Sequence, residues 1–401
     1  MNQKVVVIGH GYTSRLGVIR ALGKCGYEVI VIVIMVGVKK GKPDTSRPVD
    51  SYSKYISKIY YCLPDSECLI ELLLDKCTDK TQKVVVIPDS DMSAAAIDLN
   101  QERLAKHFIL PNINHCPGAV VEWMSKMRQK ETAARLGLNV AKGVVIEVVD
   151  GVYTVPAEIS YPCFPKPLAT LVGAKTGLGK CETEQDLQDA IDRLIQRSPT
   201  ISILVEEYKK IDEEHALMGV SDGNNVLIPG VIHTTSLASG GHFGVAKRGL
   251  IEPNANYQEL MGGFKTFVQE TGFVGIFDID FYKSGGKYYF CEMNFRYGGS
   301  GYAYTKMGVN LPVIFVQMVT GECQIDDKAS IDRIASFVNE RMCLDDWYNG
   351  YISTREFRAL RRDSEISFIN DKDDPLPQRH FNKMVLRAGA KRMVKKIIGK
   401  H

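Results

Sequence analysis

The sequence lacks the features that mark secreted, membrane-spanning and zinc-binding proteins. Its most apolar run covers only residues 29–38, which is too short to span a bilayer as a helix. The ten cysteines form no C-x-x-C pair, and several stand inside apolar runs, which argues against a zinc site and against a disulfide framework. The chain enters an apolar strand almost at once, so we expect no signal peptide. These absences predict a cytoplasmic protein with reduced thiols.

The sequence also lacks a strong excess of charge. Its 401 residues hold 50 Lys and Arg against 47 Asp and Glu, a formal net charge of +3. That excess is too small to indicate a nucleic-acid partner by itself, and neither an aromatic pattern nor a fold signal supports one. The composition is ordinary for a globular protein, and the length predicts two or three domains.

The first 115 residues alternate apolar strands with helical segments, which predicts a doubly wound parallel sheet. Gly9 and Gly11 follow the first strand, but Ser14 stands where a dinucleotide fingerprint needs its third glycine. NAD binding is therefore the weaker interpretation. Asp89, Ser90 and Asp91 follow a later strand, at the sheet edge where such folds bind ligands, so they are candidates for a substrate site.

A predicted hairpin around residue 285 holds the most informative residues. Residues 276–281 alternate apolar and acidic side chains, and a second strand follows a Gly-Gly turn. Asp280 can then lie opposite Glu292, with Asn294 and Arg296 on the same face. Two carboxylates and an amide oxygen suit Mg²⁺, and an arginine suits a phosphoryl group. A surface hairpin with solvated charges is the alternative, which the apolar neighbours disfavour, since a buried polar set needs a ligand.

This pattern resembles the metal- and phosphate-binding strand pair of the ATP-grasp superfamily, most closely its carbamoyl-phosphate-synthase-like and D-aspartate-ligase-like branch. The residues that carry the likeness are Asp280, Glu292-x-Asn294-x-Arg296 and Gly298-Gly299-Ser300. Phe295 replaces a proline that is frequent in the family, and no ligand is lost. The likeness covers roughly residues 1–322. It implies a multidomain α/β and α+β protein with the ATP-grasp fold and an N-terminal Rossmann-like (preATP-grasp) domain.

We expect the chain to have four parts, of which the resemblance implies the first three. They are a Rossmann-like domain over 1–115, a lid over 116–205, a large lobe with the Mg–ATP site over 206–324, and a C-terminal extension over 325–401. In the family, the first part usually holds acceptor substrate rather than nucleotide. Arg248 and Ser300 join the substrate candidates, Arg248 because a guanidinium can hold a carboxylate.

Two lysines match the family's phosphate-binding positions. Lys126 stands on a helix predicted over 121–136, and Lys166 ends a strand between two prolines. A glycine-rich segment with Lys175 and Gly177 follows. It is not a Walker A loop, because the spacing is wrong and a cysteine stands where Ser or Thr is required. We interpret it as a flap over the triphosphate, with a plain flexible turn as the alternative.

The resemblance implies that residues after the predicted strand 201–205 bind the adenosine part of ATP. The resemblance makes Glu206, Glu207 and Tyr208 the hinge beside adenine. It gives Glu214 to the ribose and places His233 near the nucleotide. A solvated acidic loop and a structural histidine are the respective alternatives.

The resemblance implies an ATP-dependent carboxylate–amine ligase that works through an acyl phosphate. Asp280, Glu292 and Asn294 would hold Mg²⁺ (or Mn²⁺), while Arg296 and Lys166 stabilise the transferring phosphoryl group. Small carboxylate and amine substrates are implied, with addition of an amino acid to a cell-wall, peptide or polysaccharide precursor, and a homodimer is a further expectation. Two alternatives stay open: a bicarbonate-using carboxylase or carbamoyl-phosphate-type enzyme, and a non-catalytic ATP-binding regulator.

The last stretch, residues 381–401, carries seven Lys or Arg and no acid. Its apolar residues fall on one helical stripe, typical of a basic helix that lies on an anionic membrane surface. A helix packed on the domain with a solvated basic face is the alternative.

Overall fold

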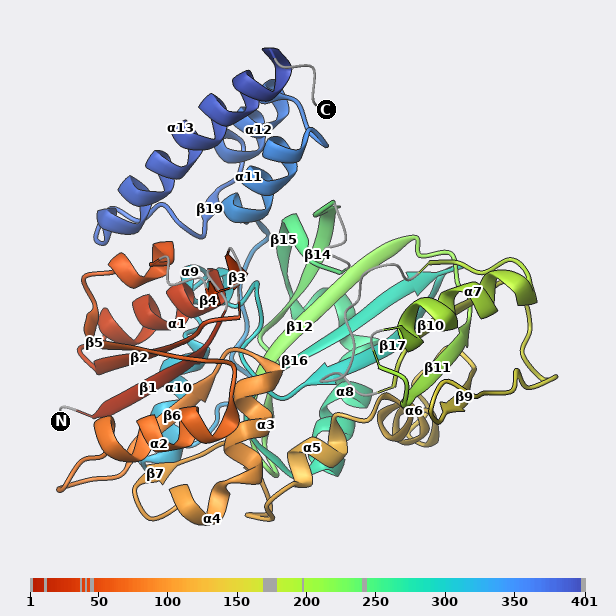
Figure 1. The fold of residues 1–401 in the computed structure, drawn as a ribbon. Helices are drawn as coiled ribbons and strands as arrows, with labels where there is room; N and C mark the ends of the chain where they lie inside the picture. The colour runs from red at the N-terminus through yellow and green to blue at the C-terminus, as the bar shows by residue number, and fades with distance from the viewer. Residues whose placement is uncertain are drawn as a thin grey trace.

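The computed structural model describes residues 3–10, 13–36, 38–39, 42–43, 47–168, 179–196, 198–239 and 244–397. Two of the predicted ATP-binding residues, Lys175 and Gly177, lie outside these ranges. Figure 1 shows a layered N-terminal part, a large sheet at the centre, a small sheet at one side and a group of helices at the C-terminal end. No helix among the described residues combines the length and apolar character needed to cross a membrane.

The N-terminal part is a doubly wound parallel sheet, as predicted. Its strand order is β5-β2-β1-β6-β7. The strands are β1 (Lys4–Gly9), β2 (Glu28–Ile34), β5 (Ile56–Cys62), β6 (Val84–Pro88) and β7 (Phe108–Ile109). Side chains of β1 and β2 alternate between two cores, one shared with α1 (Thr13–Gly23) and one with α2 (Ser66–Lys76) and α3 (Asp91–Leu99). Burial on both faces explains the nearly continuous β-branched runs.

A small antiparallel sheet of order β10-β11-β9 lies largely within residues 116–205, the part predicted to be the lid. Its strands are β9 (Gly143–Val148), β10 (Cys163–Pro167) and β11 (Ile201–Glu207). Helix α7 (Glu184–Ile195) covers one face with Leu187, Ile191 and Leu194. Thr183 and Asp186 form the capping box at the start of this helix, as their spacing predicts.

The central sheet has nine strands, of which seven follow the order β17-β16-β12-β14-β15-β18-β19. Their bounds are β12 (Glu213–Asp222), β14 (Gly230–Leu237), β15 (Ala246–Pro253), β16 (Phe273–Ser284), β17 (Lys287–Asn294), β18 (Ala335–Val338) and β19 (Ile366–Ser367). Two short strands, β8 (Asn112–Ile113) and β13 (Val226–Leu227), pair with β16 and β12. Helix α8 (Gln258–Thr271) covers one face through Phe264 and Phe267, which share a core with Phe277 and Ile279.

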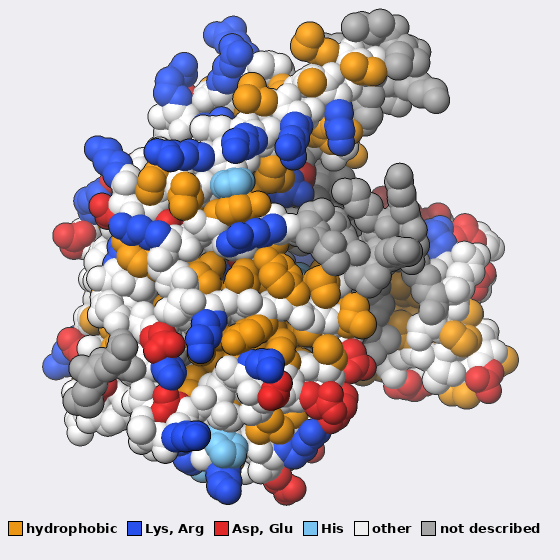
Figure 2. Space-filling model, turned by 60° about the vertical axis from the view of Figure 1, so that its left-hand side comes forward, with side chains coloured by type: hydrophobic (Ala, Val, Ile, Leu, Met, Phe, Trp, Pro, Cys, Tyr) orange, Lys and Arg blue, Asp and Glu red, His pale blue; other side chains and the backbone are white. Residues whose placement is uncertain are grey.

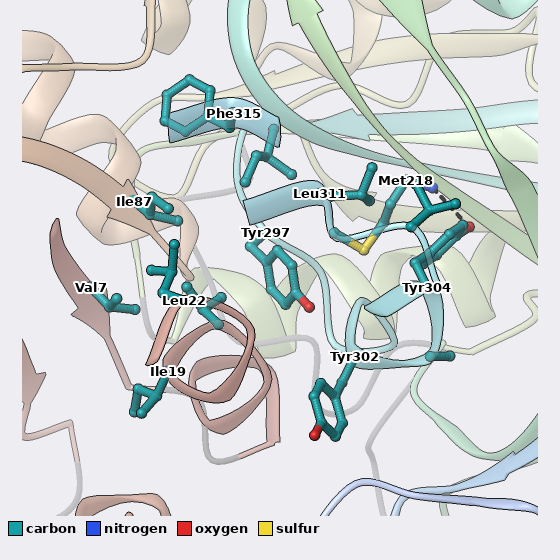
Figure 3. Close-up of a cluster of buried hydrophobic side chains, with 14 of the residues drawn as sticks. Val7, Ile19, Leu22, Ile87, Met218, Tyr297, Tyr302, Tyr304, Leu311 and Phe315 are labelled. Carbon is teal, nitrogen blue, oxygen red and sulfur yellow. Dashed lines mark hydrogen bonds between the residues drawn. The ribbon is translucent and has the colours of Figure 1, made fainter. Parts of the chain in front are cut away.

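A common core joins the N-terminal sheet to the central one. Figure 3 shows Val7 and Ile19 of the first part beside Tyr297, Tyr302 and other side chains that follow β17. These come largely from α9 (Tyr302–Lys306) and α10 (Leu311–Val319). The Tyr304 hydroxyl accepts a hydrogen bond from the Met218 amide at 3.1 Å and donates one to the Gly230 carbonyl at 3.0 Å. This core packs one face of the first sheet against the central sheet.

The predicted helix over 121–136 is two helices, α5 (Ala119–Trp123) and α6 (Lys126–Arg135). The chain breaks because the Gln129 amide donates to the carbonyl of Trp123 at 2.7 Å and to that of Met293 at 2.9 Å. Gln129 therefore draws the first turn of α6 against β17 and interrupts the helix before it.

The C-terminal helices are α11 (Glu340–Asn349), α12 (Thr354–Arg362) and α13 (Pro375–Ile397). Phe381 of α13 is buried in a small core with Trp347 and Phe357, whereas Leu386 and Met393 are 74% and 65% exposed. The fully buried Arg20 of α1 anchors this part: it donates to Asp374 at 2.9 Å and to two carbonyls just before it.

We propose the four-part division of the chain with two changes: short segments from the first part and from the C-terminal extension belong to the central sheet. Residues 112–113 form β8 and residues 335–338 and 366–367 form β18 and β19, and all three strands belong to the central sheet. The C-terminal extension thereby continues the sheet as well as adding helices.

Candidate active site

The predicted hairpin is formed by β16 and β17. Their register sets Asp280 opposite Glu292 and Asp278 opposite Asn294. Asn294 Nδ2 lies 3.3 Å from Asp280 Oδ2. Residues that face each other in an antiparallel pair share one side of the sheet, so these four polar side chains form one surface. The alternate residues of β16 are buried against α8, which leaves the polar surface toward the lid side.

A bulge shapes this surface. The register shifts between Asp280 and Phe281, and Cys291 is the residue left without an opposite number. An extra residue re-aims the side chains next to it. Cys291 thereby lies close enough to Lys166 to interact with its charge, while burial raises the pKa of the thiol to about 11.

Arg296 is held between two carboxylates. Its Nε lies 3.1 Å from Asp91 Oδ1, and its Nη1 lies 2.9 Å from Asp278 Oδ2. Burial by itself lowers the pKa of this guanidinium, but the two carboxylates outweigh burial and raise it. For Asp278, burial raises the pKa against the opposing effect of Arg296. The arginine is therefore a fixed, permanently charged group at the edge of the surface.

Lys126 also reaches this surface, from the first residue of α6. Its Nζ lies 3.4 Å from Glu292 Oε2, and only 7% of its side chain is exposed. The Gln129 side chain, which also accepts from the Met293 amide at 2.7 Å, sets the distance between α6 and β17.

Lys166 belongs to a buried group of three charged residues. The sequence predicted Lys166 and Glu206 as site residues but not the third, Lys130. Lys166 Nζ lies 2.8 Å from Glu206 Oε2, and Lys130 forms an ion pair with the same carboxylate. Burial opposes the charged form of Glu206, yet the two lysines lower its pKa below the ordinary value. Burial likewise opposes the charged Lys166, but its negative neighbours raise the pKa of its ammonium. Lys130 was detectable as the residue four after Lys126 on the same helix.

The residues predicted to bind adenosine, Glu207, Tyr208 and Glu214, lie around the end of β11 and the start of β12. The Glu207 carboxylate accepts from the Lys142 amide at 3.0 Å, and the Tyr208 amide donates to the Pro162 carbonyl at 2.9 Å. Glu214 is paired in register with Tyr282, two positions from Asp280 and on the same face. Burial raises the pKa of the Glu214 carboxyl. The structure thus brings Glu214 to the side of the sheet that carries the hairpin's polar residues.

His233 lies elsewhere. It is paired in register with His215, which is paired in turn with Phe281, so its side chain belongs to the face opposite Glu214. Its contact with a nucleotide stays a prediction.

Most of the predicted substrate-binding residues are buried or form hydrogen bonds within the protein. Asp89 is buried under Gly9, where a Cβ atom would come within 1.4 Å of its Oδ1, and Ser90 caps α3 by accepting from the Ser93 amide. Arg248 donates to the carbonyl of Asp363 at 3.3 Å. Ser300 is half-buried just before α9. Asp91, the third residue after β6, accepts a hydrogen bond from Arg296 at 3.1 Å.

His10 is a further candidate, directly after β1 at the carboxyl edge of the sheet. Its side chain is exposed, and the atoms around it desolvate the ring enough to lower its pKa, helped by the charge of Arg15. The charges of Asp91 and Arg296 also act on it. Its place at the end of the first strand was the signal available in the sequence.

Residues 125–323 match the family described as "Carbamoyl-phosphate synthase L chain, ATP binding domain". Among curated proteins, the carbamoyl phosphate synthase large chain of Clostridium acetobutylicum is 24% identical over 59% of this chain and 23% of its own length. The D-aspartate ligase of Enterococcus faecium is 21% identical over 61% of each chain. The chain thus spans between 11% and 23% of the length of these carbamoyl phosphate synthases.

Solved structures show the same fold at low sequence identity. The L-amino acid ligase from Bacillus licheniformis superposes with a TM-score of 0.59 at 16% identity, over 84% of this chain and 79% of that one. The N5-carboxyaminoimidazole synthetase of Staphylococcus aureus with ADP gives 0.62 at 17%, over 88% and 86%. The biotin carboxylase domain of the Hydrogenobacter thermophilus 2-oxoglutarate carboxylase gives 0.63 at 18%, over 83% and 73%. The chain therefore has the ATP-grasp fold, and its sequence resembles the carbamoyl-phosphate-synthase-like and D-aspartate-ligase-like branch of that superfamily.

Proposed function

We propose that this protein is an ADP-forming ligase that joins a carboxylate to an amine through an acyl phosphate. One observation carries the proposal: the oxygen donors of Asp280, Glu292 and Asn294 share a face with the fixed Arg296, and Lys126 approaches Glu292 from α6. Burying carboxylates and cations together on one face is costly unless they are paired or bind a ligand. The arrangement therefore favours a site for a charged ligand.

The donor set fits Mg²⁺, and Mn²⁺ by the same chemistry. Two carboxylates and one amide oxygen are hard ligands, and Mg²⁺ takes its remaining ligands from phosphate and water. Bound there, the ion would neutralise phosphate charge and orient the phosphates of ATP. Asn294 is oriented by its hydrogen bond to Asp280 at 3.3 Å, which ties the two donors together before the ion binds.

The chain's cations supply the remaining stabilisation. The side chains of Lys126 and Lys166 are only 7% and 14% exposed. Their charges would therefore act on a phosphate with less screening than in water. Arg296 is held in place by Asp91 and Asp278, which makes it a preorganised donor for the oxygens that gain charge during transfer. Glu214 is assigned to the ribose, with Glu207 and Tyr208 beside adenine.

An amino acid is the substrate class that we favour, added to a cell-wall, peptide or polysaccharide precursor. The printed names of two similar proteins, a D-aspartate ligase and an L-amino acid ligase, support it. The acceptor site falls at the carboxyl edge of the N-terminal sheet, beside His10 and Asp91.

A second candidate is a bicarbonate-using carboxylase or carbamoyl-phosphate-type enzyme. Its support is the likeness to a biotin carboxylase domain solved with MgADP and bicarbonate. A regulator that binds ATP without turnover is the weakest candidate, because binding alone does not need both carboxylates and Arg296.

The test is a screen of amino acids and small carboxylates with ATP and Mg²⁺, followed by phosphate release and by mass spectrometry of the product. We expect ADP release to require both substrates and to vanish in Glu292→Ala, while the exposed Glu259→Ala control keeps full activity. Release with bicarbonate and no amine would favour the carboxylase. Full activity of a folded Glu292→Ala would contradict the assignment.

We also infer peripheral contact of residues 381–401 with anionic membranes in an otherwise cytoplasmic protein. Leu386, Met393 and Val394 are exposed on α13, and Figure 2 shows Lys and Arg side chains beside hydrophobic ones over the helices at the top. Co-sedimentation with phosphatidylserine vesicles, lost in Leu386→Glu and absent with neutral vesicles, is the expected result. A homodimer is proposed as well, and light scattering on the purified protein tests it.

A further inference from the structure

On the face of the central sheet opposite Glu214, three metal-ligating side chains lie together. Glu213 and His215 come from β12 and His233 from β14, and each offers one ligand atom within 4.8 Å of the others. His215 and His233 are register partners, and their ring centroids lie 4.8 Å apart. The group is therefore built on two adjacent strands of a rigid sheet rather than on loops.

His215 is the centre of this group and lacks a full set of partners. Its side chain is 0% exposed and stacks on Phe281 at 5.1 Å between ring centroids. Its Nε2 lies 3.2 Å from Glu213 Oε2, but its Nδ1 has no hydrogen-bond partner among the described residues. A buried polar atom without a partner is costly, and such atoms are rare in native proteins. Some ligand is needed to satisfy this imidazole.

The surroundings favour a cation over a second hydrogen bond. His233 Nδ1 lies 3.5 Å from Glu252 Oε1, and the Tyr257 hydroxyl donates to the other oxygen of Glu252 at 2.8 Å. A carboxylate that orients a histidine ring in this way is the usual support around a metal ligand.

One positive group already touches the cluster. Lys283 Nζ lies 3.2 Å from Glu213 Oε1, and its side chain is 30% exposed. Lys283 therefore pairs with Glu213, while Glu252 lies beside His233. A divalent ion would displace Lys283 from Glu213, and this long, partly exposed side chain can turn to solvent.

We propose that Glu213, His215 and His233 bind a divalent transition-metal ion of the Zn²⁺ class, with Glu252 as the outer carboxylate. Two imidazoles and one carboxylate are a nitrogen-and-oxygen set that suits Zn²⁺ far better than Mg²⁺. The site is distinct from the oxygen donors of the hairpin. It ties β12 to β14 directly behind Glu214, the residue assigned to the ribose under the proposed function.

The experiment measures metal binding without ATP, so its outcome is independent of ligase activity. The purified chain is stripped with chelator, dialysed against Zn²⁺ in excess Mg²⁺, and analysed by elemental mass spectrometry. Co²⁺ replaces Zn²⁺ in a parallel sample, and its visible absorption reports the ligand geometry. We expect about one equivalent of Zn²⁺, and a melting temperature that rises with Zn²⁺ concentration, since a ligand of the native state stabilises it.

Three variants decide the assignment. His233→Gln and Glu213→Gln are expected to lose most of the bound Zn²⁺ and the Co²⁺ absorption, while His107→Gln, which changes a histidine outside the cluster, keeps both. His215→Gln serves only if it folds, because its site is fully buried. Wild-type protein without stoichiometric Zn²⁺, or equal binding in folded His233→Gln and Glu213→Gln, overturns the proposal.

Discussion

Arg296 and Asp91 join the end of the β16–β17 hairpin to the N-terminal sheet, with 3.1 Å between Arg296 Nε and Asp91 Oδ1. Asp91 is the first residue of α3, which follows the strand edge proposed for the acceptor. The bond therefore couples the position of the guanidinium to the part of the molecule that would hold the second substrate.

Substitution at this pair should affect turnover more than ATP binding. We expect Arg296→Lys to lower kcat by about 10² to 10³, the typical loss of one preorganised donor, and Asp91→Asn to lower it by a smaller factor. Because neither residue lies at the adenosine end, KM for ATP should change little in Asp91→Asn. Steady-state kinetics with the identified substrates would measure both. A large rise of KM for ATP in Asp91→Asn, with kcat intact, would contradict the assigned role.

Within the buried group of Lys130, Glu206 and Lys166, substitution of Glu206 should destabilise the protein most, because its carboxylate pairs with both lysines. Glu206→Gln leaves two buried ammonium groups facing each other, so we expect a loss of about 3 kcal/mol in the free energy of unfolding. Lys130→Met should cost less, because Lys166 still pairs with the carboxylate at 2.8 Å. Urea unfolding of both variants measures the difference. Equal losses would mean that the carboxylate does not bridge the two lysines.

Asp371 should make the protein sensitive to acid. Burial favours the neutral carboxyl, but hydrogen bonds from Lys24, Tyr302 and Lys306 outweigh it and hold the pKa of Asp371 well below the ordinary value. A carboxyl with a depressed folded pKa contributes stability above its unfolded pKa of about 3.9, and that contribution is lost as pH falls toward the folded value. Asp371→Asn should therefore be less stable than wild type at pH 7, with the gap closing below about pH 4. Urea unfolding of both proteins at pH 7 and below about pH 4 tests this. A difference in unfolding free energy that does not change with pH would contradict it.

The thiols should fall into two reactivity classes. Burial raises the pKa of four cysteines to about 12, namely Cys62, Cys77, Cys163 and Cys343. Three cysteines are exposed, namely Cys25, Cys116 and Cys323. Since the thiolate is the reacting form, a disulfide reagent at pH 8 should modify the exposed three first and the buried four only on unfolding. Peptide mapping after brief labelling identifies them, and early modification of Cys343 would count against the packing of the C-terminal helices.

The sequence predicted local features of the site well and long-range ones poorly. The hairpin of Asp280 and Glu292 was visible because alternation along each strand and a glycine turn are local signals. Lys130 was missed because its ion-pair partner Glu206 belongs to another element, and only folding brings the two together. The break between α5 and α6 depends on the bond from Gln129 to Met293 of β17, so no helical pattern could reveal it.

The C-terminal region shows the same limit. Strands β18 and β19 have four and two residues, too short for alternation to be recognised. β18 pairs with the edge of β15, and β19 pairs with β18. The face of α13 that is buried depends on contact with α11 through Phe381 and Trp347. The excess of Lys and Arg over residues 381–401 was visible in the sequence because it depends on composition alone.

The burial of Arg20 has a consequence for how the protein is made. Its partner Asp374 lies 354 residues further along the chain. The first sheet leaves the ribosome early, yet this guanidinium must keep its water until almost the whole chain has emerged. The N-terminal domain thus reaches its final state only when the last helices arrive, and a prematurely stopped chain would carry an unfinished first domain at the opposite end from the missing residues.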